Sequence, residues 1–317
     1  DTTATVNVDL KVGSLQETVT VSGEAPMVDV QQASKTVVLT RDLIDALPTT
    51  RDVWSIGILV PGIRASSPNV GGSRLEQTGQ RAHGINSSNT EQLIDGVRAN
   101  SNETDNCCMA YMDEGIQAEA SVMTSAIPAD TAWGGIRINI IPKDGGNITS
   151  GTVFLGGSKG SWMSKNIDDY LRSRNVVTPK GVLRIQNFSA TMGGPIKRDM
   201  LWFFLSTRHM ATDELIPNTP THMYLPSGEE LPGNSLLFVR DVLGRLVWQA
   251  TPRNKLSAWW ERTLKRRDMF GANVDPRNAE IWDTHPLHGG GSAKWTATIS
   301  AKLMLEATYA LRQVRFT

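Results

Sequence analysis

Two segments near the end of the 317-residue chain, residues 255–262 and 303–312, alternate apolar and polar residues with a period of two. This period is typical of a β-strand with one apolar face, because successive side chains of a strand point to opposite sides. The apolar face comprises Leu256, Ala258, Trp260, Leu303, Leu305 and Tyr309. The pattern restricts the later part of the chain to a sheet such as that of a β-sandwich or a β-barrel.

The connections between the expected strands alternate in length. Short turns are expected at 193–199, 251–254 and 300–302, and long polar connections at 161–181, 211–233 and 264–291. Short turns at one edge and long loops at the other are typical of an outer-membrane barrel. A soluble β-sandwich would alternate as well, but with shorter loops and fewer tryptophans, whereas seven of the nine tryptophans follow residue 148. We therefore expect about seven antiparallel transmembrane strands over residues 148–317, a partial β-barrel.

Residues before 148 have a different pattern, with short mixed segments rich in small and polar residues. They predict strands at 6–10, 18–21, 92–95 and 137–141, and helices at 41–46 and 52–59 that end before prolines. The longest apolar stretch, residues 54–63, is too short for a membrane helix, which needs about 20 residues. A small α+β domain is expected here.

Composition and motifs exclude several classes of function. The 32 basic and 32 acidic residues cancel, so no basic stripe indicates a nucleic-acid partner. The five histidines lie in no recognisable catalytic motif, and Pro286 between His285 and His288 disfavours a helical metal pair. Cys107 and Cys108 are adjacent, unlike the spaced ligands of a structural zinc site, and their oxidation state stays open. We expect no catalytic residues, no cofactor and no metal.

Several segments, in this order along the chain, resemble the TonB-dependent receptors of bacterial outer membranes. They are LQETVTVSGEAP at 15–26, LPTTRDVWSIGILVPGI at 47–63, QLIDGV at 92–97, AWGGIRINIIPKDGGN at 132–147 and GGPIKRDMLWFF at 193–204. The first resembles the junction found in the subgroup with an N-terminal carboxypeptidase-regulatory-like β-sandwich. The others resemble the plug domain and the first hairpin of the barrel.

The resemblance implies a domain order and a location. Residues 1–16 would end a preceding sandwich or linker, residues 17–147 would form an α+β plug, and residues 148–317 would begin the barrel. The family usually has about 22 strands, so we expect the missing strands in further sequence or in another chain. The resemblance also implies the outer membrane and its lipid as surroundings.

The same resemblance implies an energy source and a partner. A TonB-type complex of the inner membrane would pair by strand addition with the TonB box, for which the candidate residues are Glu17, Thr18, Val19, Thr20 and Val21. The alternative is that this segment is the last strand of the preceding sandwich or a linker.

Ligand recognition would use a plug loop and a barrel loop. The polar segment 98–113 is expected to be an exposed binding loop, and 264–288 is the second candidate. The candidate residues are Arg98, Asn102, Asp105, Tyr111, Asp113, Arg266, Arg267 and Trp282. The ligand would be a siderophore, vitamin, oligosaccharide or peptide. Two other classes of function stay open, a non-transporting surface or fibre-forming β protein and a secreted hydrolase.

Overall fold

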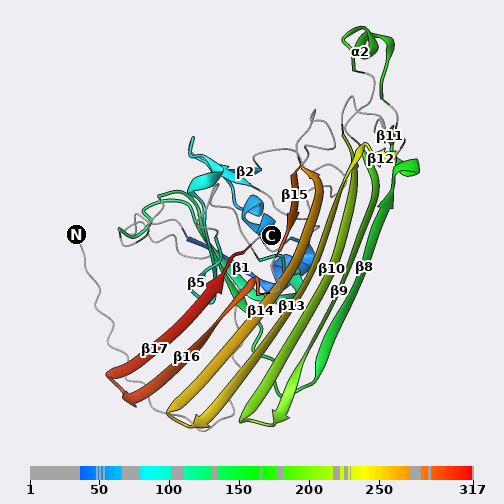
Figure 1. Ribbon diagram of the computed structural model, residues 1–317. Helices are drawn as coiled ribbons and strands as arrows, with labels where there is room; N and C mark the ends of the chain where they lie inside the picture. Colours follow the sequence, from blue (N-terminus) through cyan, green and yellow to red (C-terminus); the bar gives the residue numbers. More distant parts are fainter. Residues whose placement is uncertain are drawn as a thin grey trace, which may run out of the picture. The chain divides into compact units, whose positions relative to one another are not determined.

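The computed structural model shows two large sheets that follow each other along the chain (Figure 1), and two small sheets in which β2 pairs with β3 and β11 with β12. It describes residues 36–47, 49, 51–52, 54–65, 79–100, 110–129, 131, 134–164, 166–176, 181–216, 222–224, 228, 230–270, 280–284 and 287–315. The TonB-box candidates, both cysteines and the strands expected at 6–10 and 18–21 lie outside these residues.

The first sheet, here called the plug sheet, has the strand order β1-β6-β7-β4-β5. Its strands are antiparallel except β4 and β7, which run parallel. The elements of this part are β1 Thr36–Thr40, α1 Arg41–Ala46, η1 Ser55–Leu59, β2 Ile63–Ala65, β3 Gln80–Ala82, η3 Ser87–Asn89, β4 Glu91–Ile94, β5 Val97–Arg98, η4 Glu114–Ile116, β6 Gln117–Met123 and β7 Arg137–Pro142.

The core of this part lies on one face of the sheet. Ile138 and Ile140 alternate with more exposed neighbours along β7, so one face of the strand is fully buried. Trp54 is fully buried beside them, and its indole Nε1 donates a hydrogen bond to the Ala110 carbonyl at 2.8 Å. The core also includes Phe204, Leu243 and Trp259 from the second sheet, so the two sheets share apolar contacts.

The expected helices are only partly correct. The helix predicted at 41–46 is confirmed as α1. The helix predicted at 52–59 is wrong in type and start, because η1 is a 3₁₀ helix that begins at Ser55. Asp52 instead forms an isolated β-bridge with Asp113, and its carboxylate accepts a hydrogen bond from the Trp54 amide.

The second sheet, here called the barrel sheet, has the antiparallel order β17-β16-β14-β13-β10-β9-β8, with β15 paired to β14. Apart from the short β15, the described residues form seven strands that pair in sequence order, in agreement with the expected number of about seven. The elements are β8 Ser150–Lys159, η5 Gly160–Trp162, α2 Asp169–Ser173, β9 Val182–Lys197, β10 Leu201–Leu215, β11 His222–Tyr224, β12 Glu230–Pro232, β13 Asn234–Thr251, β14 Asn254–Phe270, β15 Glu280–Asp283, β16 Gly289–Ser300 and β17 Leu303–Gln313. The domain limits at 16 and 147 stay a prediction.

Short turns and long loops alternate as expected, but their bounds differ. The turn predicted at 193–199 is wrong, because β9 continues to Lys197 and the chain turns at 198–200. Gly193 and Gly194 are strand glycines at a close approach: a Cβ at Gly193 would lie 3.2 Å from the Gly145 Cα. Two long connections are also shorter than predicted, since β10 runs to Leu215 and β14 to Phe270.

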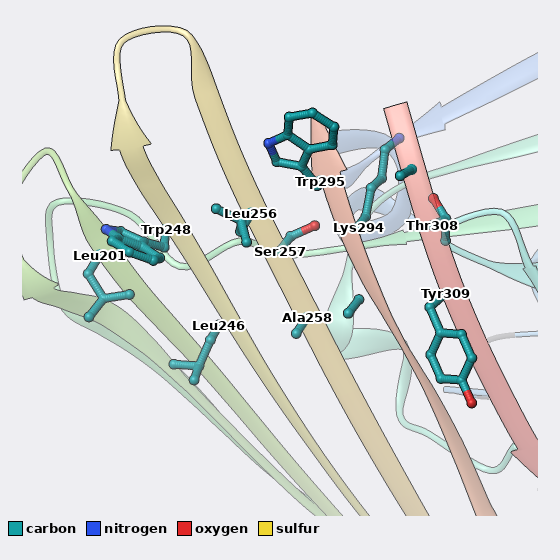
Figure 2. Close-up of a pocket in the computed structure, with 12 residues that line it drawn as sticks. Leu201, Leu246, Trp248, Leu256, Ser257, Ala258, Lys294, Trp295, Thr308 and Tyr309 are labelled. Atoms are coloured by element: carbon teal, nitrogen blue, oxygen red, sulfur yellow. The ribbon is translucent and has the colours of Figure 1, made fainter. Parts of the chain in front are cut away.

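The predicted facing of the alternating strands agrees with the structure. Leu256 and Trp260 are exposed on the outward face of β14, whereas Trp259 and Glu261 are buried on the inward face. Figure 2 shows part of the outward face, where Ala258 lies between Leu246 and Tyr309 among the residues that line an apolar pocket. In β17 the side chains of both faces are largely exposed. Among the described residues, no helix is long and apolar enough to cross a membrane.

Candidate functional site: the contacts between plug and barrel wall

The inward face of the barrel sheet buries charged side chains. Arg208 on β10, Asp241 and Arg245 on β13, and Glu261 and Lys265 on β14 are all buried. A buried charge is costly unless it is paired or hydrogen-bonded. Their partners therefore define the candidate site, and most of them belong to the plug.

Arg208 and Lys265 hold the segment that ends the predicted plug loop. The Arg208 Nη1 donates to the carbonyls of Tyr111 and Met112 at 3.1 and 3.2 Å, and its Nε donates to the Asn187 side chain on β9. The Lys265 Nζ donates to the Tyr111 hydroxyl at 3.0 Å and lies 4.9 Å from the centre of its ring. Two cations of the barrel wall thus hold two consecutive plug residues.

Arg245 joins two turns of the plug. Its guanidinium contacts Asp95 and Asp144 at 2.7 Å each, and Lys255 reaches Asp144 at 3.0 Å. Asp95 occupies the tight turn between β4 and β5 with φ +51°, a conformation that Asp adopts more readily than most residues. A Cβ at the neighbouring Gly145 would lie 2.5 Å from the Phe203 carbonyl oxygen, so this loop lies directly against β10.

A third cluster lies inside the plug. Arg51 contacts the fully buried Asp113 at 2.5 and 3.1 Å and Glu114 at 3.5 Å. The Thr49 hydroxyl and the Arg41 side chain also bind Glu114, the latter at its carbonyl. Burial raises the pKa of Glu114, and the Thr49 hydrogen bond and the Arg51 charge oppose this shift without cancelling it. Arg51 also lies 4.2 Å above the ring of Phe154 on β8.

Four consecutive residues, 111–114, therefore form a junction segment. Tyr111 and Met112 are held by the barrel wall, while Asp113 and Glu114 are held by the plug residues before η1. The arrangement connects the end of the predicted loop 98–113 both to the wall and to the N-terminal part of the plug.

The wall also carries a pair of buried acids, Asp241 and Glu261. The Thr263 hydroxyl lies within hydrogen-bonding reach of both carboxylates, at 2.6 Å from Asp241. Arg312 on β17 approaches Glu261 at 3.4 Å. Within the described parts of the chain, no group of three or more His, Cys, Asp or Glu residues is arranged to hold a metal ion.

The predicted ligand residues do not come together in one site. The expectation of an exposed loop is wrong at Tyr111 and Asp113, which are 1% and 0% exposed because they bind the wall and Arg51. Arg98 lies on β5, Arg266 on the outward face of β14, and Arg267 on its inward face. Trp282 lies on β15, while Asn102 and Asp105 lie outside the described residues. The ligand role of these residues stays a prediction.

The sequence reasoning missed Arg208, Arg245 and Asp144. The alternating pattern of the barrel strands could have identified Arg208 and Arg245, because a charge at an inward position of a strand needs a partner inside the barrel. Arg208 lies between Ser206 and Met210 on the inward face, and Arg245 between Leu243 and Val247. Asp144 carried no such signal.

The contact at Asp144 predicts a dependence on pH. Burial alone would raise the pKa of Asp144, but Arg245 and Lys255 outweigh it and lower the pKa below 3.8. The stabilisation is therefore complete above pH 3.8 and is lost as the pH falls through the lower value. Because the side chain is 42% exposed, we expect a loss of less than about 1 kcal/mol. Once exchange rates are corrected for the intrinsic dependence of amide exchange on pH, the protection of residues 144–147 should fall in acid, and Asp144→Asn should abolish that part of the pH response.

Comparisons with known proteins place this fold. No protein-family model matches the chain. It is 27% identical to the "TonB-dependent transporter Oar" of Myxococcus xanthus over 214 residues, which cover 64% of this chain and 19% of that protein. The chain thus spans about a fifth of the length of that relative.

Solved structures share the fold at low sequence identity. The outer membrane transporter YddB from Escherichia coli matches with a TM-score of 0.65 and 16% identity, over 87% of this chain and 38% of that one. The siderophore receptor PirA from Acinetobacter baumannii gives 0.61 and 15%, over 86% and 39%. A ferric enterobactin receptor mutant from Pseudomonas aeruginosa gives 0.57 and 16%, over 89% and 42%.

The comparisons confirm the family resemblance and the fold class predicted from the motifs, a plug followed by part of a barrel. These relatives are described as transporters and receptors, which supports the expectation that the protein is not an enzyme. The subgroup with a carboxypeptidase-regulatory-like domain stays a prediction.

Proposed function

We propose that this chain, which shares the plug and barrel fold of TonB-dependent outer-membrane receptors, belongs to a receptor that imports a ligand too large for porins. The observation that carries the proposal is the set of charged contacts that hold the plug sheet against the inward face of the barrel sheet. A plug that must move during import needs contacts that can separate and form again. Ion pairs and single hydrogen bonds, with a few shared apolar side chains, suit this need.

The outward face supports a location in the outer membrane. Leu205, Val242, Leu246 and Trp260 are all about half exposed there, and water alone gives no reason for so large an apolar surface. Near the short turns, the Trp295 indole donates to the Asn254 side chain at 3.1 Å, as expected of an aromatic side chain at the membrane surface. We assign the short turns to the periplasm and the long loops to the outside.

Energy would come from a TonB-type protein of the inner membrane, since the outer membrane has neither ATP nor an ion gradient of its own. Residues 17–21 remain the candidate contact, by addition of a strand. The junction segment is the feature that could link that contact to a ligand, because it joins the predicted loop 98–113 to the plug residues before η1. One structural relative is named a siderophore receptor and another a ferric enterobactin receptor, so iron chelates are the first ligand class to test.

Binding to TonB tests the proposal. In the intact protein that carries this chain, the periplasmic domain of the host's TonB should bind the parent and should not bind Val19→Pro. Proline cannot donate a hydrogen bond to an added strand. Val28→Pro, outside the five candidate residues, is the matched control and should bind like the parent. Absence of binding by the parent, or equal binding by Val19→Pro, would contradict the proposed energy source.

Import tests the other half. Cells that depend on the protein should take up a ferric siderophore from a mixed panel, and uptake should stop when the proton gradient of the inner membrane is collapsed. A protein that binds TonB but imports no member of a panel of siderophores, vitamins, oligosaccharides and peptides would instead favour a non-transporting surface role.

A further inference from the structure

Two buried acids share one hydroxyl group on the inward face of the barrel sheet. Asp241 on β13 and Glu261 on β14 are both buried, and so is Thr263, which lies opposite Asp241 in the register of the two strands. The Thr263 hydroxyl oxygen lies 2.6 Å from a carboxyl oxygen of Asp241 and is also hydrogen-bonded to Glu261. A hydroxyl group has one hydrogen to donate, so it can satisfy only one of the two acids. The other acid must carry a proton of its own and donate it to the hydroxyl oxygen.

The neighbouring arginines indicate which acid holds that proton. Arg312 on β17 contacts Glu261 at 3.4 Å, so Glu261 has a cationic partner. Arg208 on β10 lies opposite Asp241 in the register, yet it donates its hydrogen bonds to Asn187 and to two plug carbonyls. Its Nη2 has no hydrogen-bond partner in the described part of the chain. An ionised Asp241 would be expected to bind that group, because a buried charge is costly without a partner. The arrangement therefore favours the proton on Asp241.

Other charged groups near the pair are bound elsewhere. Lys265 and Arg245, on the same face of the wall, bind plug residues. Asp52 and Asp113 face the wall from the plug, and both bind groups of the plug itself. His288, buried just before β16, accepts a hydrogen bond from β14 at its carbonyl, while its ring lies 3.3 Å from a backbone carbonyl. Because histidine side chains ordinarily titrate near neutral pH, His288 needs a control of its own.

We propose that Asp241, Thr263 and Glu261 form a proton-binding site that controls how firmly the barrel wall holds the junction segment. With the proton bound, neutral Asp241 donates to Thr263, and Thr263 donates to the Glu261 carboxylate. Arg208 then stays on the plug carbonyls. When the proton leaves to water, the Asp241 carboxylate becomes an acceptor for Arg208, which keeps its own protons, and the guanidinium turns from the plug to the wall. The proposal is independent of transport and of TonB.

Hydrogen exchange of the intact protein over a range of pH tests the control of the plug. The rates of amides 110–116 are corrected for the intrinsic dependence of amide exchange on pH. Their protection in the parent should be full while the proton is bound and should fall as the pH rises. The expected fall is on the order of tenfold to a hundredfold, which corresponds to the loss of a hydrogen bond to a charged group. This direction is opposite to that expected at residues 144–147, so one experiment separates the two responses.

Two amide variants should change the response in different ways. Asp241→Asn keeps the shape of the side chain but cannot become an anion, so residues 110–116 should stay protected over the whole range. Glu261→Gln removes the neighbouring negative charge, so Asp241 should lose its proton, and the junction segment its protection, at a lower pH than in the parent. Asp169→Asn, which replaces an exposed carboxylate on α2, and His288→Gln should both respond like the parent.

Infrared spectroscopy detects the proton itself, whatever the plug does. A protonated carboxyl group absorbs apart from a carboxylate, so the parent at neutral pH should show such a band, and Asp241→Asn should lack it. Absence of that band from the parent would overturn the proton site. A pH response at residues 110–116 that persists in Asp241→Asn, or disappears in His288→Gln, would assign the response to another group. A band without any pH response at these residues would overturn the control of the plug.

Discussion

Substitution of Arg208 by methionine is expected to loosen the junction segment from the barrel wall by about 3 kcal/mol. Methionine fills much of the space but cannot replace the hydrogen bonds to the Tyr111 and Met112 carbonyls and to Asn187. Arg208 is 1% exposed, so water cannot readily take its place. This value is a net free energy, because a hydrogen bond to a charged group contributes only about 1.5–3 kcal/mol net. It therefore already includes the free energy recovered when a cation is no longer buried.

Hydrogen exchange measures this effect where it occurs. Amides of residues 110–116 should exchange about a hundredfold faster in Arg208→Met, because each 1.4 kcal/mol corresponds to about a factor of ten. Arg184→Met on the neighbouring strand β9 replaces an exposed arginine and should leave these amides unchanged. Faster exchange throughout β16 and β17 would indicate damage to the barrel, and unchanged exchange at 110–116 would show that Arg208 does not hold the plug.

The sequence patterns correctly predicted the elements that are determined by residues close to one another in the sequence. Helix α1 was predicted at its observed bounds, because a proline follows it closely and its single apolar stripe buries Ile44. The facing of β14 followed from strict alternation. The helix at 52–59 failed because Asp52 pairs with Asp113, and a partner so distant in the sequence leaves no local signal.

The errors at strand ends have a different cause. Gly193 and Gly194 were interpreted as turn residues, but they allow β9 to pass close to Gly145 and Thr149. Residues 211–215 and 264–270 were interpreted as loops because they are polar, yet both continue strands. A barrel strand can extend beyond the apolar band into water, where outward residues no longer need to be apolar.

The candidate site was the least predictable part. Polarity in residues 98–113 indicated exposure, although Tyr111 and Asp113 are polar because they meet Lys265 and Arg51 in the interior. Composition alone cannot separate a solvated charge from a paired one. The alternation of the barrel strands could have done so, since it marks Arg208 and Arg245 as inward charges that require partners.

Replacement of Ala258 by arginine should destabilise the assembled barrel by about 2–4 kcal/mol. Ala258 is an outward residue four positions beyond Asn254, roughly 10 Å above the short turn and so near the middle of an apolar band about 25 Å tall. Leu246 on β13 and Ala293 on β16 flank it in register, and Tyr309 follows next to Ala293 on β17. Figure 2 shows Leu246 and Tyr309 on either side of Ala258. Leu246 and Ala293 offer no side-chain acceptor, and the single neutral hydroxyl of Tyr309 cannot satisfy the five N–H donors of a guanidinium in hydrocarbon.

The depth of the new charge, rather than the substitution itself, should determine this cost. Ala250→Arg makes the same change at the end of β13 beside the short turn, where an arginine should cost only about 0–1 kcal/mol. Both variants of the intact protein would be assembled in bilayers and unfolded in guanidinium, with heat-modifiable migration as the check on folding. A midpoint lowered only in Ala258→Arg is the expected result. Equal midpoints for both variants would mean that this face does not meet lipid. The apolar surface would then be better explained by packing against protein, as in a β-sandwich.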